Sequence, residues 1–211
     1  MANSESAFPA KLSIDYPDRP LDRLSSFFRI IFAIPILIVF WLLPGMYAFP
    51  ASNSSCEHIA YYSTAYVFLP LVLMLLFRQK YPRWWYDWNV ALIGFAYRVG
   101  SYLALLRDEY PSTDEEQAIH INIPYPDAKA LNRWLPLVKW FLAIPHYIVL
   151  AFLIIGSIVC IVIAWFAILF TGRFPRGLFD YVVGVSRWCL RVSAYAFFLT
   201  TDQYPPFSLA D

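Results

Sequence analysis

The feature that most constrains this chain is the separation of its positive charges from three long apolar stretches. These stretches cover residues 30–49, 59–77 and 140–170, and all 16 lysine and arginine residues lie outside them. A run of about 20 apolar residues is long enough to cross a bilayer. The composition agrees, since 60% of the residues are hydrophobic and only 15% are charged, against roughly a quarter in soluble domains. We therefore expect an integral membrane protein.

Composition and charge also exclude several classes of protein. A net charge of +1 gives no general attraction for phosphates, which argues against a nucleic-acid partner. Intrinsic disorder is excluded because it requires low hydrophobicity. The three cysteines and three histidines are scattered, so neither a disulfide framework nor a metal site is expected.

The chain also repeats itself. Tyr16-Pro17-Asp18 recurs as Tyr125-Pro126-Asp127, and Ala33-Ile34-Pro35 recurs as Ala143-Ile144-Pro145. A second block recurs at a shorter spacing, in which Tyr81-Pro82-Arg83, Asp87, Arg98 and Tyr102 match Phe174-Pro175-Arg176, Asp180, Arg191 and Tyr195. Ordered self-similarity of this kind predicts a tandem duplication. The change of spacing between the two blocks predicts an insertion in the first half, which we place in the stretch 44–60, rich in proline, serine and asparagine.

The positive charges predict the topology of each half. Lysine and arginine residues both precede and follow each apolar block, and such flanks stay on the cytoplasmic side. Each half is therefore expected to be a helical hairpin that enters and leaves from the cytoplasm, at about 27–78 and about 137–171. The arms of the second hairpin have about 15 residues, or roughly 23 Å at 1.5 Å per residue. Whether this hairpin spans the bilayer or only dips into it stays open.

Two further elements complete each half. Alternating apolar residues predict short strands at 11–15 and 119–123, which we expect to pair on the cytoplasmic side. After each hairpin we expect an amphipathic helix, at about 82–107 and about 176–200. The first repeat then covers residues 1–112 and the second covers 113–211, with both termini in the cytoplasm of a multi-pass protein.

The amphipathic helices carry the candidate binding residues. In the second one, four polar residues fall within a sector of about 60° at roughly 100° per residue. Such a narrow cationic stripe is typical of helices that lie at the membrane interface. The functional hypothesis is that the arginines hold anionic lipid headgroups or an acidic partner, and the alternative is pairing with an aspartate four residues away. The candidate residues are Arg83, Arg98, Arg176, Arg187 and Arg191.

No pattern in the sequence indicates catalysis. Acidic residues between 108 and 116 are accompanied by Pro111, Ser112 and Thr113, which favours a solvated linker over paired catalytic carboxylates. His146 lies in an apolar stretch without a nearby cysteine, aspartate or second histidine, which favours a core residue over a proton relay. We expect no catalytic residue, no cofactor and no metal.

The second half resembles a known bacterial membrane family. The run from Trp165 to Asp180, the pairs Arg187-Trp188 and Arg191-Val192, and the ending at residues 204–209 are similar to the signature of the family known as domain of unknown function 4389. The first half departs from this signature, because Trp84-Trp85 stand where Gly177-Leu178 stand in the second half. The resemblance implies a bacterial inner-membrane location and assigns no activity.

Three hypotheses for the function follow. The first is a non-catalytic accessory or scaffold subunit of an inner-membrane complex, with a protein partner in the membrane. The second is a lipid-binding or membrane-organising protein that uses the arginine stripes. The third, a small transporter or channel, is least favoured because the apolar blocks hold almost no charge to line a path.

Overall fold

The computed structural model describes residues 8–42, 63–113, 115 and 117–210. Within these residues the chain forms six helices and one two-stranded sheet. The insertion that we predicted at residues 44–60 lies outside the described residues. The elements, in chain order, are β1 (Lys11–Ile14), α1 (Arg23–Leu42), α2 (Ser63–Arg78), α3 (Arg83–Leu103), β2 (Ile119–Asn122), α4 (Leu135–Leu142), α5 (Ile144–Thr171) and α6 (Arg176–Ala196).

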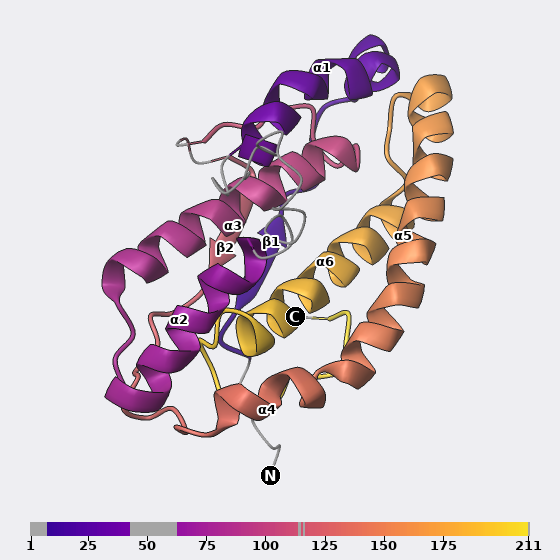
Figure 1. Ribbon diagram of the computed structural model, residues 1–211. Helices are drawn as coiled ribbons and strands as arrows, with labels where there is room; N and C mark the ends of the chain where they lie inside the picture. Colours follow the sequence, from indigo (N-terminus) through magenta and orange to yellow (C-terminus); the bar gives the residue numbers. More distant parts are fainter. Residues whose placement is uncertain (1–7, 43–62, 114, 116, 211) are drawn as a thin grey trace, which may run out of the picture.

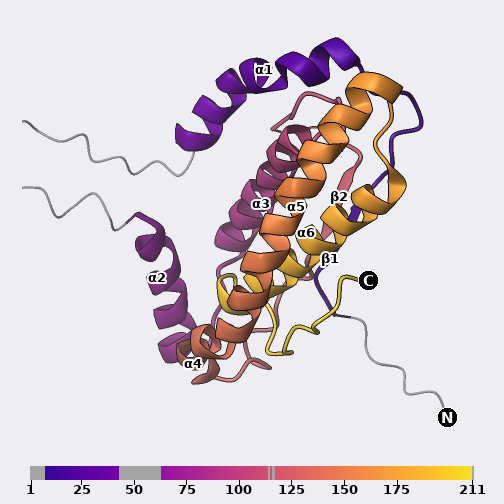
Figure 2. The ribbon, with the colours of Figure 1, turned by 90° about the vertical axis from the view of Figure 1, so that its right-hand side faces the viewer.

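The helices of the two halves lie on opposite sides of the molecule. In Figure 1, α1 lies at the top and α4 at the bottom, α3 and α2 lie on the left, and α5 lies on the right with α6 beside it. In the view of Figure 2, α2 and the end of α1 project to one side, away from the sheet. The largest core cluster joins the sheet to α5 and α6 through residues such as Leu12, Ile168 and Val183.

The two predicted strands pair as expected. β1 and β2 are antiparallel, with Leu12 opposite Ile121 and Lys11 opposite Asn122. Leu12 and Ile14 are buried while Lys11 and Ser13 are exposed, which is the period of two that predicted this strand. The sheet therefore connects the beginning of the chain with its second half.

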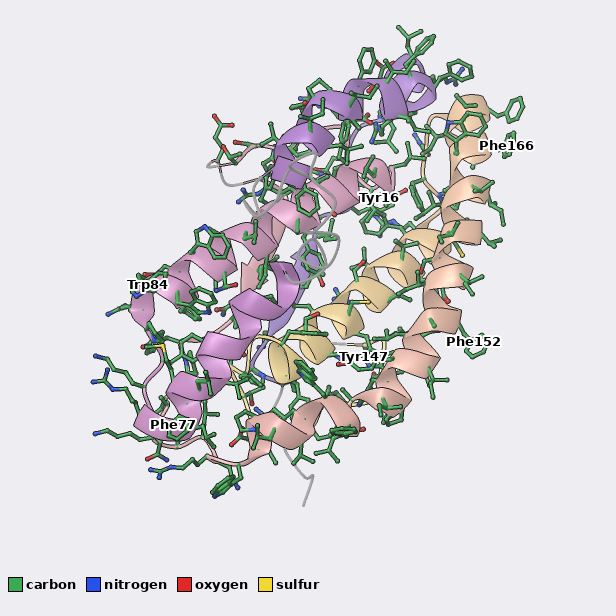
Figure 3. The ribbon with its side chains drawn as sticks, viewed as in Figure 1. Tyr16, Phe77, Trp84, Tyr147, Phe152 and Phe166 are labelled. Atoms are coloured by element: carbon green, nitrogen blue, oxygen red, sulfur yellow. The ribbon has the colours of Figure 1, made fainter. Side chains whose placement is uncertain are left out.

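Two helices are long and apolar enough to cross a membrane. They are α1 over residues 23–40 and α5 over Ile144–Thr171. Only 22% and 17% of these segments are buried inside the structure, so most of their apolar side chains face outward. Phe152 and Phe166 project from α5 in this way (Figure 3).

The second apolar block is not a hairpin, which corrects our expectation for residues 137–171. A short helix, α4, ends at Leu142, and α5 then continues without a break to Thr171. The break falls at Pro145, which stands in the first turn of α5 and lacks the N–H that would bond to the preceding turn. Pro35, by contrast, lies inside α1.

Two arms of about 15 residues would place the turn of the expected hairpin near Gly156, but α5 continues through this glycine, which packs against α6. A Cβ at Gly156 would lie 2.6 Å from Tyr181 Oη of α6. The Tyr181 hydroxyl donates a hydrogen bond of 3.2 Å to the Leu153 carbonyl. Ser157 donates to the same carbonyl at 3.0 Å, so both small residues fit inside a continuous helix. A lone glycine costs a helix only about 1 kcal/mol, which the contact between α5 and α6 offsets.

This packing makes a testable prediction. Gly156→Ala should lower the free energy of unfolding in detergent by about 1–2 kcal/mol, because Tyr181 must shift and loses its hydrogen bond. The matched control is Gly100→Ala, since a Cβ there meets nothing within 4 Å. Combining Gly156→Ala with Tyr181→Phe should recover much of the loss. Equal stability of the two alanine variants would contradict this explanation.

Candidate functional site

A buried cation in α1 organises the first half of the chain. Arg29 is 2% exposed, and its Nη1 donates to the carbonyls of Tyr102 at 3.0 Å and Arg107 at 2.6 Å. Its Nη2 forms an ion pair with Asp108. The guanidinium also lies 4.6 Å from the centre of the Tyr102 ring, a cation–π arrangement. Arg29 therefore attaches α1 to the segment that follows α3.

A second buried cation, in α4, makes the same set of contacts. Lys139 is 0% exposed, and its Nζ donates to the Thr201 carbonyl at 2.7 Å. Nζ lies 2.7 Å from Asp202 Oδ1 and 5.0 Å from the centre of the Tyr195 ring. Burial lowers the pKa of the Lys139 ammonium, and the hydrogen bond and charge of Asp202 act in the opposite direction.

The carboxylate of each cluster contacts the backbone as well as the buried cation. Asp108 Oδ2 accepts the backbone N–H of Asp22 at 2.8 Å. Asp202 Oδ2 accepts the backbone N–H of Asn132, which is the counterpart of Asp22 in the second repeat, at 2.6 Å. Each aspartate therefore fixes the chain just before α1 or α4 and holds the buried cation of that helix. We assign these clusters a structural role, because each carboxylate joins the buried cation to a backbone N–H of the chain.

Sequence reasoning did not identify these clusters as units. It took Arg29 and Lys139 as flanking positive charges that recur in the two halves, and it grouped Asp108 with a solvated linker. The available signal was the repeat itself, since the cation recurs as Lys139 and the aspartate recurs as Asp202.

The two halves also exchange contacts. Tyr16 Oη donates to the Phe174 carbonyl at 2.5 Å, and the Arg176 guanidinium lies 4.5 Å from the Tyr16 ring centre. Tyr125 makes the matching contacts in the other direction. Its Oη donates to the Tyr81 carbonyl at 2.5 Å, and the Arg83 guanidinium lies 5.7 Å from the Tyr125 ring centre. Arg83 and Arg176, both predicted binding residues, are otherwise exposed.

The other three predicted arginines face protein rather than open surface. Arg98 Nη1 donates to the carbonyls of Ser112 at 3.0 Å and Thr113 at 3.2 Å. Arg187 Nε donates to the Leu12 carbonyl of β1 at 2.9 Å.

Arg191, the last of these arginines, is 4% exposed. It donates to the carbonyls of Ser208 and Ala210 near the chain end. The reason is the position of α6, which packs between α5 and β1, so that its polar stripe meets backbone carbonyls. Contact between these arginines and lipid headgroups stays a prediction.

His146 is a core residue, as expected. It is 0% exposed, and its Nδ1 accepts the Trp188 Nε1–H at 3.0 Å. Its ring stacks on Phe207 at 4.0 Å between centres. In the part of the chain that the structure describes, no group of three or more histidine, cysteine, aspartate or glutamate residues is placed to bind a metal.

An apolar groove of about 320 Å³ lies between α3, α5 and α6. Small and polar side chains line part of it, including Gly100, Ser157 and Ser186. Tyr97 closes one side and donates to the Ser186 carbonyl at 3.1 Å. The Tyr97 hydroxyl therefore links α3 to α6 across the groove.

The buried pair in α4 makes the second testable prediction. Asp202→Asn should lower the free energy of unfolding by about 3 kcal/mol, because it leaves the Lys139 charge buried without its carboxylate. Denaturant unfolding of the purified protein in detergent measures this. The double variant with Lys139→Met should be more stable than Asp202→Asn alone. The control Asp180→Asn changes an exposed aspartate of α6 and should stay within about 0.5 kcal/mol. A similar loss in the double variant would contradict the role assigned to the pair.

Comparison with known proteins bears on the second half of the chain. No curated protein and no solved structure shows a significant match. A family model does match, over residues 134–208, which include α4, α5 and α6 with the Lys139, Asp202 and Tyr195 cluster. The resemblance seen in the sequence is thus confirmed over these residues, which match the family described as Domain of unknown function (DUF4389).

Proposed function

We propose that the protein is an integral membrane protein and acts as a non-catalytic accessory or scaffold subunit of a bacterial inner-membrane complex. The observation that carries the proposal is the outward apolar face of α5. Its large exposed side chains include Phe152 at 70%, Ile155 at 60% and Phe170 at 79% exposure. A soluble monomer rarely exposes a contiguous apolar patch above a few hundred square ångströms, so lipid or a partner protein must cover this one.

The interior supports a structural rather than a catalytic role. The buried cations Arg29 and Lys139 are both held by carboxylates and carbonyls of this chain. An enzyme of this size keeps some charged or nucleophilic groups directed at a substrate. The polar groups of the core instead join helices to one another, and the large exposed side chains of α5 are apolar.

We also propose that the two halves arose by tandem duplication. Three sets of contacts recur at matching places in the two halves: the buried cation with its aspartate, the tyrosine that donates to a carbonyl of the other half, and the arginine over that tyrosine. In the sheet, Leu12 pairs with Ile121, its own counterpart when Tyr16 is aligned with Tyr125. This register agrees with a two-fold axis through the sheet. An axis of this kind along the membrane normal is found in other duplicated membrane proteins.

The orientation that we propose rests on the positive-inside rule. Lysine and arginine residues flank the apolar stretches of the sequence, and such flanks stay in the cytoplasm. We therefore propose a multi-pass protein with the sheet and both termini in the cytoplasm.

The test places a photo-crosslinking residue on α5. A benzoylphenylalanine at Phe152 should give a discrete cross-linked protein product in cells at native expression, identified by mass spectrometry. The matched control carries the same residue at Trp84, a 68% exposed side chain at the start of α3. A stoichiometric product at Phe152, absent at Trp84, is the expected result.

Two outcomes would contradict the proposal. If the cross-linker at Phe152 captures only lipid, α5 faces the bilayer and no partner covers it. If the protein is recovered in the soluble fraction after cell lysis, the membrane location itself is wrong.

A further inference from the structure

A charged cavity lies where the two halves of the chain meet. It has a volume of about 480 Å³ and is lined by residues 16–21, which connect β1 to α1, and by Arg173, Phe174 and Arg176 of the turn from α5 into α6. A backbone hydrogen bond of 2.8 Å from Leu21 to the Gly172 carbonyl holds these two segments together. The cavity is therefore formed by two tethered segments rather than by one loop.

The lining of this cavity is strongly positive. Arg19, Arg173 and Arg176 contribute three guanidinium groups, and Asp18 is the one acidic residue among the lining residues. Arg19 and Arg173 are exposed. Among the residues that the structure describes, no hydrogen bond or ion pair is found for either guanidinium. A guanidinium group without a protein partner is suited to a bidentate contact with phosphate or carboxylate.

The start of α6 adds a second, independent attraction for anions. The residue before the helix, Pro175, provides no side-chain cap, and the first turn contains no acidic residue. The first N–H groups of a helix have no partner within the helix, and its N-terminus carries a partial positive charge. A Cβ at Gly177 would meet nothing within 4 Å, so this turn is open to a ligand.

The same basic positions recur in the other half of the sequence. When the repeats are aligned on Leu21 and Leu131, Lys129 is the counterpart of Arg19, and in the second block Lys80 and Arg83 are the counterparts of Arg173 and Arg176. The tyrosine beneath Arg176 also has its counterpart, since Arg83 lies over Tyr125 as Arg176 lies over Tyr16. The recurrence of these basic positions in both halves of the sequence, with the arginine–tyrosine contact, favours a specific use over a random surface cluster.

We propose that this cavity, the arginine cavity, binds a phosphate group. Arg19 and Arg173 contact the phosphate oxygens, and Arg176 with the first turn of α6 completes the positive surroundings. The carrier of the phosphate is an anionic phospholipid headgroup or a small soluble phosphate compound. The cavity adjoins the beginning of α1 and the end of α5, the two helices apolar enough to cross a membrane, which is where headgroups lie. The lipid source rests on the proposed membrane location, and neither source requires a protein partner.

The experiment compares two sources of phosphate on the purified full chain. In one arm, the protein in mild detergent is mixed with equal amounts of phosphatidylglycerol and phosphatidylcholine, and the retained lipids are counted by native mass spectrometry. In the other arm, binding of glycerol phosphate is measured by calorimetry. Wild type should retain phosphatidylglycerol preferentially or bind glycerol phosphate. The variant Arg19→Gln/Arg173→Gln should weaken the observed binding by about fivefold for each arginine removed.

The variant set keeps the test independent of folding. Arg176 is left in place because it contacts Tyr16, and the melting temperature of the double variant should match that of wild type. Arg19→Lys/Arg173→Lys, which keeps the charge, should recover part of the binding. The control Arg78→Gln/Lys11→Gln removes two exposed cations elsewhere and should bind as wild type does.

Each outcome decides the proposal. Loss confined to the lipid arm identifies a headgroup site, and loss confined to the glycerol phosphate arm identifies a site for a soluble phosphate compound. Equal binding by wild type and the double variant in both arms would overturn the proposal. So would an equal loss in the control variant, because attraction would then reflect surface charge in general.

Discussion

The structure depends on buried cations that are neutralised within the fold. Lys139 and Arg29 sit at 0% and 2% exposure in helices whose outer faces are apolar. An unpaired charge at such depth costs several kcal/mol, so each helix must lie where an aspartate and carbonyls reach its cation. Because Asp108 follows α3 and Asp202 follows α6, each cation fixes the first helix of its half against the end of the last. An apolar helix has few directional contacts of its own, and these clusters supply them.

The halves are joined by exchanged contacts rather than by simple side-by-side packing. β1 of the first half packs on α6 of the second, and β2 of the second packs on α3 of the first. The tyrosines Tyr16 and Tyr125 reach across in the same manner. Neither half completes its own core alone, since Leu12 and Ile14 share a cluster with Val182 and Val183 of α6. This exchange packs the apolar helices of both halves against one sheet. It also creates the arginine cavity where the two halves meet.

Residue patterns predicted many of the elements. Alternation located both strands, and the long helices α3 and α6 begin within one residue of the expected positions. The hairpin expected at 137–171 was wrong, because the pattern of an apolar block with Gly156 and Ser157 at its middle is the same for a turn and for a packing site. The presence of Tyr181 against Gly156 decides between them, and no local pattern reveals that contact.

For the candidate site, too, some features follow from the sequence and others only from the tertiary structure. By itself the sequence determined the apolar character of α1 and α5, the strands and the cationic helices, because composition and periodicity are local properties of a chain. It also determined the family resemblance of residues 134–208. Only the tertiary structure decided what the cations face. Arg98, Arg187 and Arg191 look alike on a helical projection, yet they donate to carbonyls of Ser112, Leu12 and Ser208. Arg19 and Arg173, far apart in the chain, instead share one cavity. The physical reason is that the role of a charged side chain depends on the groups that it contacts. Here those groups lie from 14 to 175 residues away along the chain from their arginines.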